Sequence, residues 1–344
     1  MNISLFPNDD NVIILSHNHT SYNLMKYRPH HEVLFRKIHT FLIHNNIIKK
    51  DRNIIDLGAW IGDNSLPWSK MIDGIVYAID PSKSNCDYIE KLKLLNKSDN
   101  IKVIQEAISN KKDMLSTNDD LTHCSFVYNN VENNGKTKIS STYLDKLYED
   151  DIINNIGYIH LDVEGMEYLV LKGAKQIILN ERPVVTYEIH LNLDKNIDTI
   201  QNMFTDNNYF VYMINEILPG NRTDCRNFLA IPIELLEEYI PNTNNISKKF
   251  IENMESDFNK YRYVLINHIG RCVYTFYNNK KDIEYAYNIL NGGEFATIVF
   301  DILNDAILFE YGEKIIINEC KKYYKSHISD NTNDLYKNIL IFKK

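Results

Sequence analysis

The sequence has few cysteines for its length, and no two of them lie close together. Its 344 residues include five, namely Cys86, Cys124, Cys225, Cys272 and Cys320. The number is odd and no C-x-x-C pair occurs, so the pattern supports neither a disulfide framework nor a zinc knuckle. We therefore expect reduced thiols and a cytoplasmic location.

Long apolar runs and an excess of positive charge are also missing. No stretch approaches the ~20 apolar residues of a membrane helix, and the N-terminus, MNISLFPNDDNV, carries acid where a signal peptide needs Lys or Arg. The net charge of −8 disfavours a general binder of phosphate backbones. We expect no membrane association, and the acidic balance argues against a nucleic-acid partner.

Strand-like and helix-like segments alternate through the middle of the chain, which is typical of βαβ units and a mainly parallel sheet. The expected strands are Ile54–Leu57, Ile75–Ile79, Ile101–Ile104, Ile156–Leu161, Val184–His190, Phe210–Ile214 and Phe228–Ile231. The expected helices are Asn64–Met71, Ser84–Asn96, Tyr143–Tyr148, Gly165–Leu179 and Asp198–Asn207, with an irregular stretch at 109–136.

The rhythm changes near residue 241, which predicts a domain boundary. Residues 1–50 are interpreted as an N-terminal arm and helix, 51–240 as an α/β domain, and 246–344 as a smaller α+β accessory domain of unknown role. The linker between them is rich in Pro and Asn. Hairpins are expected in the accessory domain, at Tyr263–Tyr277 and at Thr297–Tyr311. This domain could support a homo-oligomer.

Three successive strands end in acid, at Asp56, Asp80 and Glu106. Ligands of α/β sheets bind beyond the carboxyl ends of the strands. The turn after the first strand, Asp56-Leu-Gly-Ala-Trp-Ile-Gly-Asp63, has Gly-x-x-x-Gly spacing, with Trp60 where a dinucleotide fold needs its second glycine. A carboxylate suits the ammonium and sulfonium of S-adenosylmethionine better than a diphosphate. Asp80 could then bind a ribose diol and Glu106 the adenine amino group.

A fourth strand, Ile156–Leu161, ends in Asp162-Val-Glu164-Gly165 and then becomes helix-spaced. Burying acid at a strand end costs free energy that a functional role explains. The alternative for Asp162 is a helix cap, and Glu164 and Glu167 could charge the first turn of the helix favourably.

Taken together, these blocks resemble the FkbM family of S-adenosylmethionine-dependent methyltransferases, from about Asp51 to Pro232. IIDLGAWIGDNS and VYAIDPS are similar to its first two motifs, IHLDVEGMEYLVLKGA resembles its D-V-E-G signature, and RPVVTYEIH and NFLAIP resemble its later strands. The resemblance implies a class I methyltransferase, Rossmann-like sheet flanked by helices. Characterised members mostly methylate hydroxyls of sugars or other small molecules.

The resemblance also implies roles by position. The methionine moiety of the cofactor would be held by Asp56, Gly58, Ala59, Trp60, Gly62 and Asp63. Asp80 would hold the ribose, with Pro81 and Ser82 in the same motif, and Glu106 and Ala107 would border the adenine. Two residues depart from the family pattern: Trp60 stands where Asn is usual, and His160 where Lys is usual.

Methyl transfer to a hydroxyl needs in-line approach and a base. Strand periodicity places Glu188 and His190 on one face of their strand, and His160 and Asp162 on one face of theirs. If the two strands are neighbours, Asp162 organises the site and Glu188 or His190 is the base, with Glu164 and His160 nearby. The same Asp162, Glu188 and His190 could bind a divalent metal, which we do not favour. His190 could also be a hydrogen-bonded core histidine.

The sequence therefore predicts an S-adenosylmethionine-dependent O-methyltransferase (EC 2.1.1 class) acting on a sugar, a glycan or another small molecule. An RNA ribose methyltransferase is the enzyme alternative, and it is disfavoured because no lysines are clearly placed at the site. A non-catalytic binding or regulatory subunit with the same fold is the other alternative. Intact acids at all four strand ends argue against it.

Overall fold

We describe the protein from a computed structural model. The description covers residues 3–5, 14–16, 39, 42–43, 46–117, 137–190, 196–214, 225–235, 296–301 and 306–311. The hairpin expected at Tyr263–Tyr277 and the linker near residue 241 lie outside these residues. Within them, no helix combines the length and the apolar character that crossing a membrane requires.

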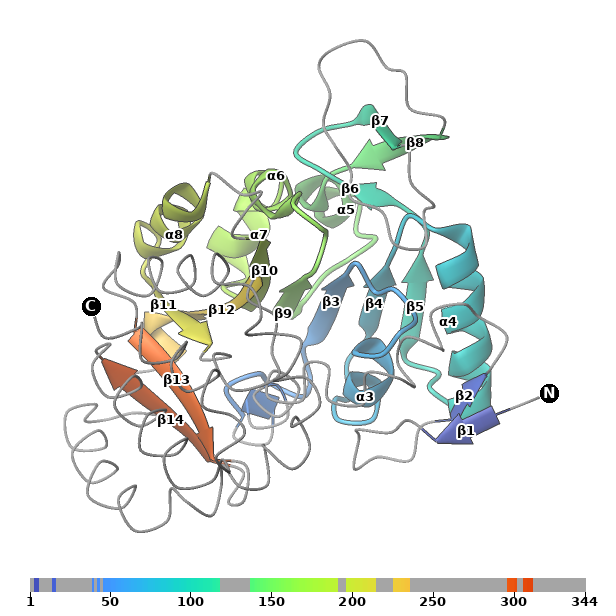
Figure 1. Cartoon of the computed structure of the whole chain (residues 1–344), viewed down its shortest axis with the longest axis horizontal. Coiled ribbons are helices and arrows are strands. Elements are labelled where there is room, and N and C mark those ends of the chain that lie inside the picture. Colours follow the sequence, from blue (N-terminus) through green and yellow to red (C-terminus); the bar gives the residue numbers. More distant parts are fainter. Residues whose placement is uncertain are drawn as a thin grey trace, which may run out of the picture.

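One large sheet organises the described part of the chain (Figure 1). Its nine strands follow the order β14-β13-β11-β12-β10-β9-β3-β4-β5. The strands are β3 (Asn53–Leu57), β4 (Val76–Ile79), β5 (Ile101–Ile104), β9 (Ile156–Leu161), β10 (Val184–His190), β11 (Tyr209–Ile214), β12 (Cys225–Pro232), β13 (Ala296–Asp301) and β14 (Ala306–Tyr311).

The strands in the middle of this sheet are parallel. β5, β4, β3, β9 and β10 pair in parallel, whereas β12 runs antiparallel to both β10 and β11. The predicted α/β fold with a mainly parallel sheet is confirmed, and so is the neighbour relationship of β9 and β10. The chain leaves β3 toward β4 on one side and later returns to β9 on the other, so a topological switch point lies between β3 and β9.

Helices cover both faces of the sheet, and strand alternation divides the core between the faces. Along β9, Tyr158 belongs to the cluster that α3 (Ser65–Ser69) and α4 (Lys83–Asn96) cover. Ile159 and Leu161 belong to the opposite cluster, under α5 (Leu144–Glu149), α6 (Glu167–Lys172), α7 (Lys175–Asn180) and α8 (Ile197–Thr205). Because successive side chains point to opposite faces, residues 158, 160 and 186 share the α3 face.

Some predicted elements differ from the structure. The single helix expected over Gly165–Leu179 is two helices, α6 and α7, which meet at Gly173. A Cβ on Gly173 would lie 2.4 Å from the Ser109 carbonyl oxygen, so a close approach of a distant segment accompanies the break. The stretch expected to be irregular contains β7 (Asp113–Thr117), which forms a small sheet with β6 (Ala107–Ile108) and β8 (Thr137–Thr142). The polar arm contains a short hairpin, β1 (Ile3–Leu5) and β2 (Ile14–Ser16).

The C-terminal hairpin joins the large sheet. β13 and β14 form the expected antiparallel pair, and β13 also pairs in parallel with β11. The sheet of the α/β domain therefore continues into the region interpreted as an accessory domain. Most of residues 246–344 lie outside the described part, so the domain boundary stays a prediction.

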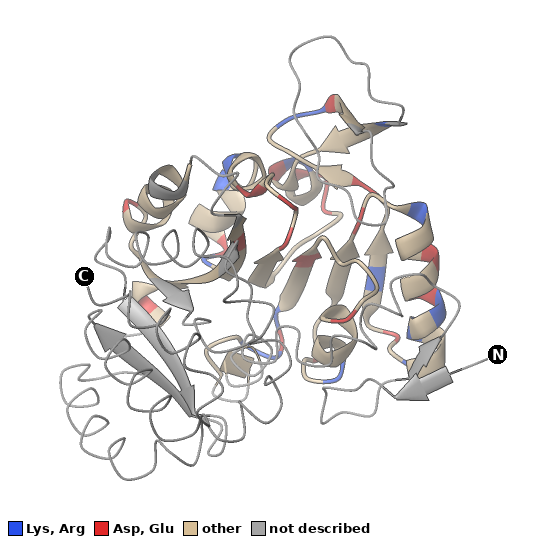
Figure 2. Ribbon diagram, viewed as in Figure 1, with Lys and Arg blue, Asp and Glu red and all other residues tan. Residues whose placement is uncertain are grey.

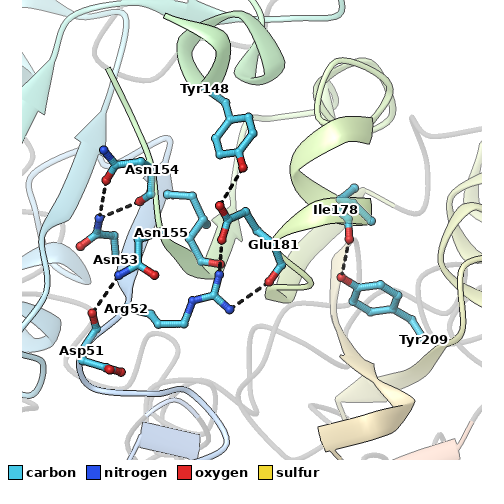
Figure 3. A network of polar contacts seen from close by, with 10 residues as sticks. Asp51, Arg52, Asn53, Tyr148, Asn154, Asn155, Ile178, Glu181 and Tyr209 are labelled. Atoms are coloured by element: carbon cyan, nitrogen blue, oxygen red, sulfur yellow. Dashed lines mark hydrogen bonds and ion pairs between the residues drawn. The ribbon is translucent and has the colours of Figure 1, made fainter. Parts of the chain in front are cut away.

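A polar network ties the strands together at their amino ends, opposite the edge at which the ligand is predicted to bind (Figure 3). Arg52 donates to the carbonyl oxygens of Ile156 at 2.6 Å and Glu181 at 2.9 Å, and it pairs with the Glu181 carboxylate. Tyr148 donates to the other oxygen of that carboxylate at 2.8 Å. The network links the start of β3 to β9, to α5 and to the segment before β10.

Candidate functional site

The turn between β3 and α3 presses against the end of β9. Gly58 and Gly62 have φ of +77° and +76°, values that glycine adopts at little cost. A Cβ on Gly58 would lie 1.8 Å from the Asp162 carbonyl oxygen, and the Asp162 N–H donates to the Leu57 carbonyl at 3.0 Å. The structure therefore brings the predicted cofactor turn and Asp162 into contact at the switch point.

Asp80, at the end of β4, is held by three donors. Its carboxylate accepts from the backbone N–H of Trp60 at 3.0 Å, the N–H of Ser82 at 2.8 Å and the Asn85 side chain at 3.0 Å. Burial raises the pKa of Asp80 to about 6. A carboxylate offers roughly four lone-pair sites, so it retains capacity for a further donor. Pro81 is half-buried beside it.

Trp60, the first departure from the family pattern, has φ of +44° and is half-buried. Its backbone N–H donates to Asp80, which ties the glycine turn to the end of the next strand. Ala59 and Asp63 of the same turn are buried. The turn is thus packed on its inner side and anchored at both ends.

Asp56 lies deeper than its neighbours in the predicted set. It is buried within β3, its carboxylate accepts from the Ser65 hydroxyl at the start of α3, and it pairs in register with His160 of β9. This contact supports the beginning of α3. A direct contact between Asp56 and a cofactor stays a prediction.

The third predicted acid stands where β5 leads into β6. Glu106 is half-buried, and burial raises its pKa while Lys112 lowers it. Ala107 is buried as the first residue of β6. Because β5 pairs in parallel with β4, Glu106 and Asp80 share one edge of the sheet.

The segment after β9 turns sharply and carries several acids. Glu164 and Gly165 have φ of +51° and +94°, while Asp162 and Glu164 are half-buried. Glu167 is fully buried, and one of its carboxylate oxygens accepts from the N–H groups of Val163 and Gly165, at 3.2 Å each. Figure 2 shows acidic ribbon (red) in this loop and at neighbouring strand ends.

Glu167 is the residue whose role the sequence reasoning missed. It was interpreted only as a favourable charge on a helix terminus, yet burial and the nearby Glu188 raise its pKa to about 8. The available signal was a second acid three residues after Glu164, which is close enough to fold back onto the loop. The carboxyl of Glu167 therefore supports the acidic loop from inside.

Glu188, on β10, is buried and pairs in register with Asn227 of β12. β10 lies beside β9, with Tyr187 opposite Leu161, so Glu188 and Asp162 each come one residue after that pair. His190 ends β10, but its side chain lies outside the described residues. The choice between Glu188 and His190 as base stays a prediction. Among the described side chains, no cluster of three or more His, Cys, Asp or Glu is placed to hold a metal.

His160, the second departure, is an interior residue rather than an edge residue. It is buried on the α3 face, with Thr186 and Asn64 at its two ring nitrogens. The residues at the edge itself are predominantly acidic, with half-buried carboxylates beside the glycine turn. These carboxylates would attract a positively charged ligand and could accept hydrogen bonds from its hydroxyl groups, whereas they would repel a diphosphate.

Comparison with known proteins gives a family match over this part of the chain. Residues 56–214 match the family model described as the methyltransferase FkbM domain. The match falls within the region of the sequence resemblance and includes the glycine turn, Asp80, the loop after β9, and β10. No curated protein matches the chain.

Among solved structures, methyltransferase FkbM from Methylobacillus flagellatus KT shows 13% identity, a TM-score of 0.38, and coverage of 63% of this chain and 56% of that chain. Precorrin-6y C5,15-methyltransferase from Geobacter metallireducens GS-15 shows 10% identity, a TM-score of 0.36, and coverage of 57% and 88%. A SAM dependent methyltransferase from Aquifex aeolicus shows 13% identity, a TM-score of 0.34, and coverage of 62% and 98%.

Proposed function

We propose that this chain, an S-adenosylmethionine-dependent methyltransferase by the FkbM domain of its residues 56–214, methylates a hydroxyl oxygen of a sugar, a glycan or another small molecule. The observation that carries the proposal is the contact of the acidic loop with the glycine turn. The Asp162 carbonyl oxygen lies where a Cβ of residue 58 would be. This contact supports a single site in which the carboxylates adjoin the predicted cofactor turn.

A hydroxyl is a weak nucleophile and must lose its proton as the new bond forms. The bound cofactor supplies a methyl group activated by its sulfonium. Carboxylates adjoin the turn: Asp162 and Glu164 are half-buried at the edge, and Glu188 is buried on the adjacent strand. In this proposal Asp162 orients the hydroxyl, and Glu188 or His190 takes its proton.

The charge of the edge favours an uncharged or cationic acceptor. The segments that form it, residues 56–64, 80–82, 106–107, 160–167 and 186–190, contain acids but neither Lys nor Arg. A phosphate group would be repelled by Glu164 and Asp162 and would find no cation in these segments. The charge of the edge therefore favours neutral sugars over RNA and nucleotide-linked acceptors.

The experiment has two stages. Calorimetry with S-adenosylmethionine should detect binding by the full chain, and Asp80→Ala should weaken it sharply, because Asp80 is the acid proposed to hold the ribose. A labelled-methyl screen over neutral glycans, nucleotide sugars, small hydroxy compounds and RNA then identifies the acceptor class. Absence of binding would overturn the methyltransferase proposal. Labelling of RNA alone would overturn the acceptor class, and loss of transfer on adding a chelator would establish the metal alternative.

A further inference from the structure

A buried chain of hydrogen-bonding groups runs from the cofactor turn to the segment before the FkbM domain. The Asn64 amide nitrogen lies 3.4 Å from His160 Nε2, and His160 Nδ1 lies 3.2 Å from the Thr186 hydroxyl. Thr186 contacts the Tyr158 hydroxyl, which contacts His39 Nε2. All five residues are buried, and His39 lies outside residues 56–214.

Ring packing holds this chain in place. The His39 ring makes edge contacts with Trp68 at 4.8 Å and Tyr158 at 5.1 Å between centroids, and Trp68 makes one with His160 at 5.6 Å. Trp68 belongs to α3, the helix that the cofactor turn leads into. Edge-to-face packing of this kind favours defined ring orientations. What can still change within this set of hydrogen-bonded groups is the position of their protons.

The protons of the chain are coupled. A neutral imidazole has one donor and one acceptor nitrogen, and a hydroxyl donates one proton. If Asn64 donates to His160 Nε2, the proton of neutral His160 is on Nδ1 and is donated to Thr186. Thr186 then donates to Tyr158, which donates to His39. One donor direction therefore runs through all five groups.

Asn64 is the member of this hydrogen-bonded series that belongs to the predicted cofactor turn. It is the residue immediately before α3 and closes the glycine turn. Its carboxamide oxygen is buried and has no hydrogen-bond partner within the described part of the chain. Nothing described there competes with His160 for the direction of the carboxamide, so the proton position on His160 decides which end of the amide faces it.

We propose that His39, Tyr158, Thr186 and His160 form a positioning relay that sets the orientation of Asn64 and thereby the shape of the cofactor turn. His39 brings the N-terminal segment into the support of a site that lies within another part of the sequence. The proposal rests on the proposed function, because it assumes that the turn holds S-adenosylmethionine. The four residues act through Asn64 and are positioning residues.

Two replacements at Thr186 give a matched test. Thr186→Val keeps the shape of the side chain and removes the hydroxyl, whereas Thr186→Ser keeps the hydroxyl. A hydrogen bond contributes ~1 kcal/mol, so we expect S-adenosylmethionine to bind Thr186→Val roughly fivefold more weakly, with Thr186→Ser within twofold of the unchanged protein. Tyr158→Phe removes the hydroxyl between Thr186 and His39 and leaves only their direct 3.5 Å contact, so it tests the relay in case Thr186→Val does not fold. Tyr187→Phe, at a buried tyrosine on the opposite face, is the control.

The readouts separate the relay from general stability. Calorimetry gives the dissociation constant well below the unfolding temperature, and ¹⁵N NMR of the histidine rings reports their tautomers without cofactor. We expect the signals of His39 and His160 to shift together in Thr186→Val and to remain in place in Tyr187→Phe. Unchanged affinity in Thr186→Val and Tyr158→Phe would overturn the relay. If the unchanged protein bound no S-adenosylmethionine, the proposed function would fail instead, and the joint ring shifts would still test the relay.

Discussion

Gly58 and Asp162 are in backbone contact across the switch point of the sheet: a Cβ on Gly58 would lie 1.8 Å from the Asp162 carbonyl oxygen. The contact joins the predicted cofactor turn to the loop that carries the candidate catalytic acids. Two segments about a hundred residues apart are thus positioned by one steric requirement. The atom that a Cβ would meet belongs to the backbone of Asp162, and it cannot rotate away as a side-chain atom can.

Gly58→Ala should therefore abolish cofactor binding and destabilise the fold. The φ of +77° alone costs roughly 1–2 kcal/mol with a Cβ, and the clash with a backbone oxygen adds to it. Gly165→Ala is the matched control, because its φ of +94° is also positive but a Cβ there meets nothing within 4 Å. Thermal unfolding and calorimetry should separate the two variants. Equal losses in both would show that the contact with Asp162 is unimportant.

Cofactor affinity should fall as the pH drops through the pKa of Asp80, which burial raises to about 6. If Asp80 holds the ribose as predicted, its ionised carboxylate, present above this pKa, would accept hydrogen bonds from the ribose hydroxyls, and protonation below it would replace an acceptor with a donor. At pH 5 only about a tenth of Asp80 is ionised, so the dissociation constant should be roughly tenfold higher than at pH 7. Asp80→Asn should bind weakly with a flat profile. A wild-type slope retained in that variant would assign it to another group.

Glu167 should make stability depend on pH in the opposite sense from an ordinary surface acid. Its pKa is raised from 4.5 to about 8 in the folded protein, so its contribution to stability is complete below about pH 4.5 and is lost as the pH rises toward 8. The loss is about 1.4 kcal/mol per pH unit inside that window.

Urea unfolding of the unchanged protein and of Glu167→Gln at several pH values from 5 to 7.5 measures this effect. The unchanged protein should lose stability relative to the variant at each step upward. The exposed Glu90→Gln corrects for removal of one acid. A difference between the two proteins that stays constant with pH would mean that Glu167 is already ionised in the fold.

The parts of the structure that sequence predicted best are those whose cause is local. β9 and β10 begin and end at the bounds predicted for them, Ile156–Leu161 and Val184–His190, because both segments are short and rich in the β-branched and aromatic residues that favour strands. The strand-end acids were found in the same way. Their position at one edge of the sheet was predicted because the strands of βαβ units pair in parallel and their carboxyl ends lie together.

The parts that were missed depend on contacts between distant segments. The break between α6 and α7 accompanies the approach of Ser109 to Gly173, which leaves no signature in the helical pattern. Thr186 and His160 meet only because β10 pairs with β9 in one register. His39 joins them from a segment more than a hundred residues earlier. A single sequence gives residue types in each segment but not which segments will adjoin.

Arg52 should matter for stability and not for cofactor binding. It binds two carbonyl oxygens and the Glu181 carboxylate at the amino ends of the strands, far along the sheet from the glycine turn. Arg52→Met keeps part of the packing and leaves these acceptors without their donor, which should cost about 1–3 kcal/mol. Denaturant unfolding measures the loss, and calorimetry should show an unchanged dissociation constant for S-adenosylmethionine. Weakened binding at a temperature where the variant is fully folded would show that the network reaches the site.

Glu188 and His190 are the two candidate bases, and their replacement should separate catalysis from binding. Glu188→Gln keeps the size and polarity of a buried residue that pairs with Asn227 but cannot accept a proton. If Glu188 is the base, kcat should fall roughly 10²–10⁴-fold while the dissociation constant for S-adenosylmethionine changes little. Single-turnover transfer to the acceptor found in the screen is the measurement. His190→Gln would then lower kcat much less. The reverse ranking would assign the base to His190, and a small effect of both would leave Asp162 as the group that takes the proton, which Asp162→Asn would test in the same assay.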